Sequence, residues 1–502
     1  MPILSIRAPI GAGRLLLWMA VVLAAGGCTG PSRPLAIEGV TVVPSAAAPD
    51  VPGATVLIEE GRIRCIGPEN ECPVPAGAIR FPADGMWLLP GLIDTHTHPA
   101  WSTDRNRTWG EERLRFLFGV TTTRDASTSA QLEANLATRE LAADPGTPIP
   151  RLVVAGRLYG DSARDEGTAR EEVSRLAALG VDAIKVKEPL EPSIYAAIVE
   201  AAREHGLDVY GHMWGEDPPR SAVASALHAG VGGYSHLMGF PPLAVDSLAL
   251  AAAPTPVRSD AWKIWRRTLW ADADPDSMAR VARALAESGA WIEPLLLSDE
   301  LWSRPYHIPL PLVRMFEVPL AARLLLADRR PSPTTDEERV RLEVSLERTR
   351  RFLRDFAGAG GTVIVGSDGS LMPGLSVHEE MRALVDGGLT PAQALSAATE
   401  DAARVLGVSD SLGRIEPGMV ADLVLLEADP REDIRNTLRL VRVIKGGRIY
   451  DPVVLRDELA GSPEVTDSSR RWWVAVLALV VTLAAFGYLM GTHRERLRHE
   501  GR

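Results

Sequence analysis

Residues 88–99, LLPGLIDTHTHP, mark the point at which the hydrophobicity pattern of this chain changes. From about residue 36 up to this stretch, apolar runs such as IEGVTVV alternate with Gly and Pro turns, which predicts short strands. Beyond it, strand-like apolar runs alternate with helix-like segments such as SIYAAIVEAAREHG. That alternation predicts a parallel sheet whose strands are connected by helices.

The strand-like runs after this stretch are numerous enough to close a barrel. They are GVTTTRDA, RLVVAG, VDAIKVK, DVYGHM, VGGYSHL, AWIEPLLL and TVIVGSD. Together with GLIDTHTHP they form seven or eight strand–helix units, which predicts a (β/α)8 TIM barrel over residues 92–408. The segment 241–345, rich in Trp and Pro, is expected to form helices and long loops over the barrel mouth.

Strand-like runs return near residue 411, as LGRIEPGMVADLVLLEADP and VRVIKGGRIYDP. The simplest arrangement pairs these late strands with the early ones. We therefore expect an α/β chain in which the barrel is inserted into a small β-sandwich domain, formed by residues 36–91 and 409–458.

The two chain ends predict export and membrane attachment. Residues 1–28 carry Arg7 and Arg14, then an apolar run and Cys28, as in a bacterial lipoprotein signal. Lipidation of Cys28 is expected, although Ala25 stands where such signals usually have Leu. Cleavage as an ordinary signal peptide, or an uncleaved anchor, is the alternative.

At the other end we expect a linker at 459–471, a transmembrane helix at 472–491 and a cytosolic tail at 492–502. The span is uncharged and long enough to cross a bilayer, and more Arg follows it than precedes it. This topology places the protein in the bacterial cell envelope, with the body of the chain outside the cytoplasm. Cys65 and Cys72 fit an oxidising compartment as a disulfide, or remain two reduced thiols.

The overall charge of the 502 residues is -11, which argues against a nucleic-acid partner. Reactive groups of barrel enzymes lie at the carboxyl ends of the strands. Five such positions carry metal-ligand side chains: His96, His98, His212, His236 and Asp368. His96 and His98 are two residues apart on a strand, so both imidazoles face the same side and reach one ion.

Lysine is rare here, because only Lys185, Lys187, Lys263 and Lys445 occur among 54 Lys and Arg residues. Two of the four stand together in GVDAIKVKEP, residues 180–189. A solvated charge would be served equally by Arg, whereas a reaction that needs an amine excludes it.

The motifs LLPGLIDTHTHP, GVTTTRDA, VIVGSDGS and HEEMRALVDGGLTPAQALSAATEDAARVLGVSDSLGRIEPGMVADLVLLEADP resemble the metal-dependent amidohydrolase superfamily. Within it, they are most similar to the imidazolonepropionase-like and prolidase-like branch. The resemblance covers roughly residues 36–455 and is thin between about 241 and 345. It implies a (β/α)8 barrel with a β-sandwich built from both chain ends.

The resemblance also implies a ligand set for two divalent ions, for which Zn²⁺ is the best candidate on availability. His96 and His98 would bind one ion and His212 and His236 the other. Lys185, carboxylated by carbon dioxide to a carbamate, would bridge the two. Asp368 would bind metal and take a proton from the bridging hydroxide, which it then passes to the leaving group.

The implied activity is hydrolysis of an amide-type bond in a small molecule, such as a dipeptide, an N-acyl amino acid or a cyclic amide. Tyr234, Trp214 and His307 are candidate substrate contacts. The same site could open a lactone or cleave another ester. Relatives with one metal would leave Lys185 as a plain lysine, and a silent, tethered binding protein is the alternative outside enzymes. The complete ligand set argues against that last alternative.

Overall fold

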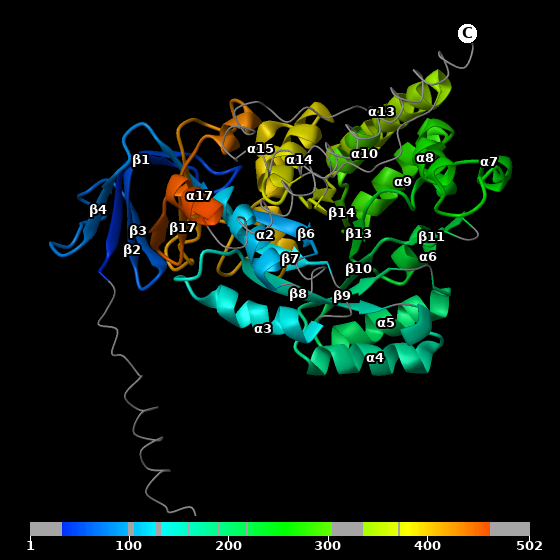
Figure 1. Ribbon diagram of the computed structural model, residues 1–502, viewed down its shortest axis with the longest axis horizontal. Coiled ribbons are helices and arrows are strands. Elements are labelled where there is room, and N and C mark those ends of the chain that lie inside the picture. Colours follow the sequence, from blue (N-terminus) through cyan, green and yellow to red (C-terminus); the bar gives the residue numbers. More distant parts are fainter. Residues whose placement is uncertain are drawn as a thin grey trace, which may run out of the picture.

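Two eight-stranded sheets organise the part of the chain that the computed structural model describes (Figure 1). The described residues are 33–98, 105–126, 132–158, 160–187, 190–216, 219–303, 335–369 and 372–461. The strands of one sheet come from the middle of the sequence. The strands of the other sheet come from both ends of the described sequence.

The larger unit is a closed parallel barrel. Its sheet order is β15-β14-β13-β10-β9-β8-β7-β6. The order of the barrel strands around the sheet is therefore the same as their order in the sequence. The strands are β6 (Leu92–Thr97), β7 (Val120–Asp125), β8 (Arg151–Leu158), β9 (Ala183–Val186), β10 (Asp208–Gly211), β13 (Gly233–Ser235), β14 (Trp291–Glu293) and β15 (Thr362–Val363).

The first and last strands close the barrel through backbone hydrogen bonds. The amide of Thr95 donates to the carbonyl of Val365 at 3.0 Å, and the amide of Asp368 donates to the carbonyl of His96 at 2.8 Å. All eight strand-like runs that the sequence analysis selected form barrel strands. The prediction of a TIM-barrel fold is therefore confirmed.

Helices cover the outside of the barrel, and side chains packed inside it bury the inner face of the sheet. The strands consequently carry nearly continuous buried positions, as parallel sheets do, and not a polar–apolar alternation. The main covering helices are α2 (Arg105–Leu117), α3 (Leu132–Ala143), α4 (Glu166–Ala178), α5 (Pro192–Glu204), α6 (Val223–His228), α9 (Pro275–Glu287), α13 (Asp336–Gly358), α14 (Leu375–Asp386), α15 (Pro391–Ala397) and α16 (Glu400–Val405).

The second sheet joins the two ends of the described chain. Its order is β18-β17-β16-β5-β1-β2-β3, and β4 also pairs with β1. The strands are β1 (Leu35–Val42), β2 (Val51–Glu59), β3 (Arg62–Gly67), β4 (Ile79–Pro82), β5 (Trp87–Pro90), β16 (Leu423–Leu426), β17 (Leu440–Lys445) and β18 (Arg448–Tyr450). The late strand β16 lies antiparallel to the early strand β5, which is the pairing that the sequence predicts.

This sheet folds around a core of its own. Apolar side chains from both halves, including Val40, Ile58, Leu88, Leu423 and Ile444, form one buried cluster. On the margin of the sheet, Cys65 of β3 and Cys72 form a disulfide, and Cys72 is buried against Ala36 and Leu57. The disulfide links two residues only seven positions apart, so it fixes the turn after β3.

The final described helix corrects one boundary. The sequence analysis begins a linker at residue 459, whereas α17 runs over Pro452–Gly461. The helix continues because Leu455 and Leu459 pack in an apolar cluster with Phe116 and Phe118, at the carboxyl end of α2 and just beyond it.

The segment 241–345 contains both helices and a barrel strand. Its described elements, besides α9, β14 and the start of α13, are α7 (Ser247–Ala251), α8 (Asp260–Thr268), α10 (Leu296–Ser303) and single 3-10 turns. Figure 1 shows α7 and α8 at the periphery, on the side of the barrel away from β1–β4.

The predictions for the chain ends fall on residues that the structure does not describe. These are the signal at 1–28, lipidation of Cys28, most of the 459–471 linker, the transmembrane helix at 472–491 and the tail at 492–502. Within the described residues, no helix combines the length and apolar character needed to cross a bilayer.

Candidate metal centre

The histidine pair lies at the carboxyl end of the first barrel strand. His96 is the penultimate residue of β6 and is fully buried, and His98 follows the strand at its rim. Their ring centroids are 5.2 Å apart. The sequence prediction that both imidazoles approach one point is consistent with this spacing.

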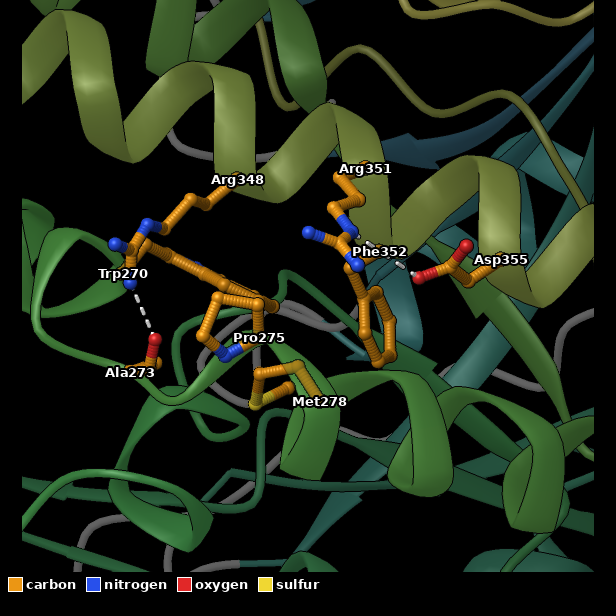
Figure 2. Close-up of a pocket in the computed structure, with 8 residues that line it drawn as sticks. All are labelled: Trp270, Ala273, Pro275, Met278, Arg348, Arg351, Phe352 and Asp355. Atoms are coloured by element: carbon orange, nitrogen blue, oxygen red, sulfur yellow. Dashed lines mark hydrogen bonds and ion pairs between the residues drawn. The ribbon is translucent and has the colours of Figure 1, made fainter.

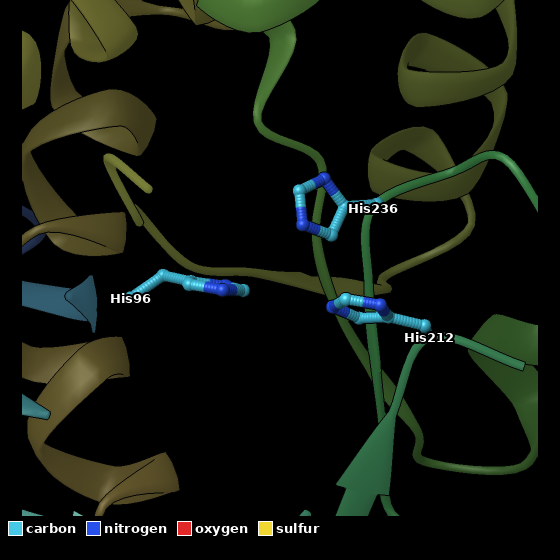
Figure 3. A group of neighbouring side chains, drawn as sticks. All are labelled: His96, His212 and His236. Carbon is cyan, nitrogen blue, oxygen red and sulfur yellow. The ribbon is translucent and has the colours of Figure 1, made fainter. Parts of the chain in front are cut away.

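Two further histidines reach the same place from neighbouring strands, as Figure 3 shows for His96, His212 and His236. His212 follows β10 and His236 follows β13, and their ring centroids lie 4.7 Å apart. The centroid of His96 is 6.2 Å from that of His212 and 5.2 Å from that of His236. Three strands therefore deliver imidazoles to one centre.

Asp368 completes the group from the last strand of the barrel. Its Oδ1 lies 3.1 Å from Nε2 of His98 and 3.7 Å from Nε2 of His96, and its Oδ2 lies 3.6 Å from Nε2 of His236. Asp368 has φ +48° and His236 has φ +58°, which is the left-handed region that side chains rarely adopt. Strained backbone at two candidate ligand positions is typical of functional sites.

Lys185 enters the centre from β9, the fourth barrel strand. It is almost fully buried, and its amine lies 3.0 Å from Nε2 of His96. Among the described residues, that imidazole is the only hydrogen-bond partner of the amine. Burial lowers the pKa of Lys185 to about 7, so a substantial share of the amine is neutral near neutral pH. Lys187, two residues on, is exposed.

The environment also favours neutral imidazoles and an ionised carboxylate. Burial lowers the pKa of His98 to about 4 and that of His236 to about 3, and it holds the pKa of His212 well below its usual value. Burial alone would raise the pKa of Asp368, but the hydrogen bond with His98 and the adjacent His96 hold it well below its usual range. Neutral imidazole and carboxylate are the protonation states that bind metal ions.

The donor set fits divalent metal ions. The nitrogens of His96, His212 and His236 all lie within 4.8 Å of one another, and so do the ligand atoms of His96, His98 and Asp368. In addition, Nε2 of His212 is buried without a hydrogen-bond partner among the described residues. A buried imidazole nitrogen in that state is costly unless it binds something. A metal ion at this centre would satisfy that nitrogen.

A buried carboxylate below this centre is a residue that the sequence analysis missed. Glu293, the last residue of β14, is fully buried, and its Oε2 lies 2.5 Å from Nδ1 of His96. Its Oε1 lies 3.1 Å from Nη2 of Arg124, which comes from β7. Burial opposes ionisation, yet His96 and Arg124 hold the pKa of Glu293 well below its usual range. A single Glu within the apolar run AWIEPLLL gave no sign of these contacts.

Asp94 ties the first strand to the last. Its Oδ1 accepts hydrogen bonds from the amides of His96 at 3.2 Å and Ser367 at 2.9 Å, and its Oδ2 accepts from the hydroxyl of Ser367 at 2.6 Å. Since Ser367 directly precedes Asp368, this carboxylate fixes two parts of the centre relative to each other.

The three candidate substrate contacts lie in different places. Tyr234 packs against Phe240 in the layer between sheet and helices, with ring centroids 5.7 Å apart, so the structure does not bring it to the metal centre. Trp214 is buried in a cluster with Trp262 and Leu269. His307 lies outside the described residues.

The structure also has a small hollow between α9 and α13, away from the candidate ligands (Figure 2). None of the predicted metal ligands lines it, so it is separate from the candidate centre. Its lining residues are Trp270, Ala273, Pro275, Met278, Arg348, Arg351, Phe352 and Asp355.

A closed parallel barrel with histidine and aspartate ligands at the carboxyl ends of its strands defines a barrel enzyme with a candidate metal centre. Comparison with known families then identifies the family within this class. The chain matches the amidohydrolase family over residues 87–450, which is more than half of its length, and it belongs to that family. It is accordingly a hydrolase that acts on carbon–nitrogen bonds.

Individual relatives are more distant. The chain is 28% identical to an imidazolonepropionase of Cereibacter sphaeroides, over 76% of this chain and 89% of that protein. It is 45% identical to a 5-methylthioadenosine/S-adenosylhomocysteine deaminase of Symbiobacterium thermophilum, but only over 13% of this chain and 15% of that enzyme. The family match and the long similarity to an imidazolonepropionase support the imidazolonepropionase-like branch that the motifs predict.

Solved structures share the fold at lower identity. A putative prolidase from Bifidobacterium longum is 22% identical, covers 86% of this chain and all of its own length, and superposes with a TM-score of 0.60. A molinate hydrolase is 18% identical, covers 87% of this chain and 98% of its own, and also has a TM-score of 0.60. At these identities the likeness concerns the fold.

Proposed function

We propose that this chain hydrolyses an amide bond in a small substrate, such as a dipeptide, an N-acyl amino acid or a cyclic amide. One observation carries the proposal: five barrel strands deliver four imidazoles, a carboxylate and a buried amine to one centre. The names of the related imidazolonepropionase and prolidase support the choice of amide substrates.

The proposed metal ligands are His96, His98, Lys185, His212, His236 and Asp368. Divalent ions bound there, with zinc the best match to imidazole and carboxylate ligands, would supply Lewis acidity that activates water and polarises the scissile carbonyl. A barrel interior that is closed by packed side chains keeps these charges in a low-dielectric setting, where they act more strongly.

Lys185 is proposed to become a carbamate. Its neutral amine attacks carbon dioxide, an N–C bond forms and one proton leaves to solvent, so a neutral amine becomes an anionic oxygen ligand. The lowered pKa of the amine and its position 3.0 Å from the imidazole of His96 support this assignment. An Arg at this position would stay protonated and could not react in this way.

Asp368 is proposed as the group that moves the proton. It is ionised and lies at the mouth of the barrel between His98 and His236. It takes the proton of the attacking water as a general base and returns it to the leaving amine as a general acid. The left-handed backbone at Asp368 aims its carboxylate into the centre, where a regular strand would not place it.

A substrate screen tests the proposal. Metal-loaded protein is assayed against dipeptides, N-acyl amino acids, cyclic amides, lactones and simple esters, with the Asp368→Asn variant as the matched control. We expect amide hydrolysis that falls by about 10²–10⁴-fold in the variant. Hydrolysis of esters or lactones alone would replace the amide assignment, and no turnover of any member by metal-loaded protein would favour a binding role.

We further propose that the enzyme is exported and tethered to the membrane of the cell envelope. The Cys65–Cys72 disulfide supports an oxidising compartment, and the sequence of both chain ends supports the topology. Fusion of a topology reporter after Arg502 tests this proposal. A cytosolic reporter on a membrane-bound protein agrees with it, and a reporter active in the periplasm contradicts it.

A further inference from the structure

Glu293 has an unusually complete set of partners for a carboxylate in the interior of a barrel. Its Oε1 accepts hydrogen bonds from the hydroxyl of Thr95 and from Nη2 of Arg124. Its Oε2 accepts from the hydroxyl of Ser235 at 2.6 Å and contacts Nδ1 of His96 at 2.5 Å. These partners come from three other strands, β6, β7 and β13, so the carboxylate is held from several sides.

The surroundings keep Glu293 charged and in place. Arg124 donates from Nε to the carbonyl of Thr95 at 2.7 Å, and its guanidinium lies 4.0 Å from the ring centroid of Tyr210. Gly366 leaves the necessary space, because a Cβ there would lie 2.6 Å from Cβ of His96 and 2.8 Å from Oε1 of Glu293. A buried ion pair of this kind contributes little to stability compared with apolar packing of the same volume.

The contact with His96 has a chemical consequence. An ionised carboxylate only accepts hydrogen bonds, so Nδ1 of His96 must carry the proton. Nε2 of the same ring then presents its lone pair, and that nitrogen faces the amine of Lys185 at 3.0 Å and Oδ1 of Asp368 at 3.7 Å. A carboxylate behind a ligand histidine fixes its tautomer and raises its basicity.

We propose that Glu293 is a positioning residue for the metal centre, which fixes His96 as the Nδ1–H tautomer and strengthens Nε2 as a ligand. The inference rests on the metal site of the proposed function, but not on the substrate. Glu293 would act through His96 and not as a metal ligand itself, and Arg124 balances the charge of Glu293.

Metal affinity measured on purified protein tests this inference without any substrate. Zinc binding is measured by competition with a chromophoric chelator, and Co²⁺ binding by its absorption spectrum, for wild type, Glu293→Gln and Glu293→Asp. We expect Glu293→Gln to lower affinity about 10–100-fold and to change the Co²⁺ spectrum. Glu293→Asp, which keeps a carboxylate, should recover part of the affinity.

Glu112→Gln is the matched control, because Glu112 is another buried Glu paired with an Arg, with Arg115 Nη1 at 2.5 Å from its Oε1. It should alter stability but leave metal affinity unchanged. Equal affinity of wild type and folded Glu293→Gln overturns the positioning role while leaving the proposed function intact. Wild type that binds no metal overturns both.

A measurement on the wild type covers the case in which Glu293→Gln does not fold. The chain has 10 histidines, and ¹⁵N labelling of their rings with a His96→Asn comparison assigns the resonances of His96. In metal-free protein we expect the Nδ1–H tautomer at His96. The Nε2–H tautomer would overturn the inference.

Discussion

Two of the four lysines are buried, and they differ in what surrounds their amines. Lys445, on β17, donates to the carbonyls of Asp144 at 3.1 Å, Thr147 at 2.9 Å and Ile149 at 2.8 Å. Lys185, on β9, has one hydrogen-bond partner among the described residues, a ring nitrogen of His96. The amine of Lys445 is thus saturated by the backbone of a barrel connection, whereas that of Lys185 is left with unused donors.

The difference shows that burial alone does not identify a reactive lysine. Burial lowers the pKa of both amines, to about 7 for Lys185 and about 8 for Lys445. The two amines differ only in their hydrogen-bond partners. Three carbonyls satisfy the three donors of an ammonium and give Lys445 a structural task, since it joins the second sheet to the barrel. An amine that lacks such partners is available for a chemical change.

The largest expected effect comes from removing the reactive amine. If Lys185 is the proposed bridging ligand, Lys185→Ala should reduce bound metal from close to two ions per chain to about one and lower kcat/KM by about 10³-fold. Metal content is measured by elemental analysis, and activity on the substrate found by the screen. Short carboxylic acids such as propionate should restore part of both.

The matched control is Lys187→Ala, which removes an exposed amine two residues away. It should leave the metal content unchanged. Two ions per chain in Lys185→Ala would remove Lys185 from the ligand set, and the contrast between the two buried lysines would then be one of packing only.

A smaller effect, of a different kind, is expected at the structural lysine. Lys445→Met removes the donor shared by three buried carbonyls, and unsatisfied buried polar groups cost about 1–3 kcal/mol each. Some of these carbonyls will find water, so we expect the free energy of unfolding to fall by about 3 kcal/mol. Urea denaturation measures it, and metal content should not change. Loss of metal in this variant would contradict the division of roles.

The smallest effect is expected at the remaining lysine. Lys263 is partly exposed on α8, where its amine lies 3.1 Å from Oδ1 of Asp260. An exposed pair of this kind contributes at most about 0.5 kcal/mol. The midpoint of urea denaturation of Lys263→Met should therefore equal that of wild type within error. A shift as large as that of Lys445→Met would show that any lysine deletion destabilises the chain. The three hydrogen bonds of Lys445 would then not explain the effect of Lys445→Met.

The fold was predictable because each barrel strand is a short apolar run that ends at a polar residue or a Gly. The gathering of the candidate ligands was predictable for the same reason: four histidines and an aspartate follow separate runs, apart from the pair in HTH. Local patterns therefore locate both strands and the groups at their ends. They carry no information on which side chain meets which across the barrel.

Two errors show where local patterns fail. Tyr234 was a candidate substrate contact because it stands just before His236 in GGYSHLM, yet its ring packs against Phe240. Ser235 points inward to Glu293 instead, and Tyr234 points toward the helices. Glu293 was missed because its role depends on His96, 197 residues earlier in the chain.

The seam between the first and last barrel strands joins residues that are far apart in the chain. His96 and Asp368 lie on opposite sides of this seam, joined by a backbone hydrogen bond of 2.8 Å and by Asp94, which holds Ser367. The candidate metal centre therefore needs the first and the last barrel strand together, so we expect a chain truncated before residue 362 to lack a complete centre.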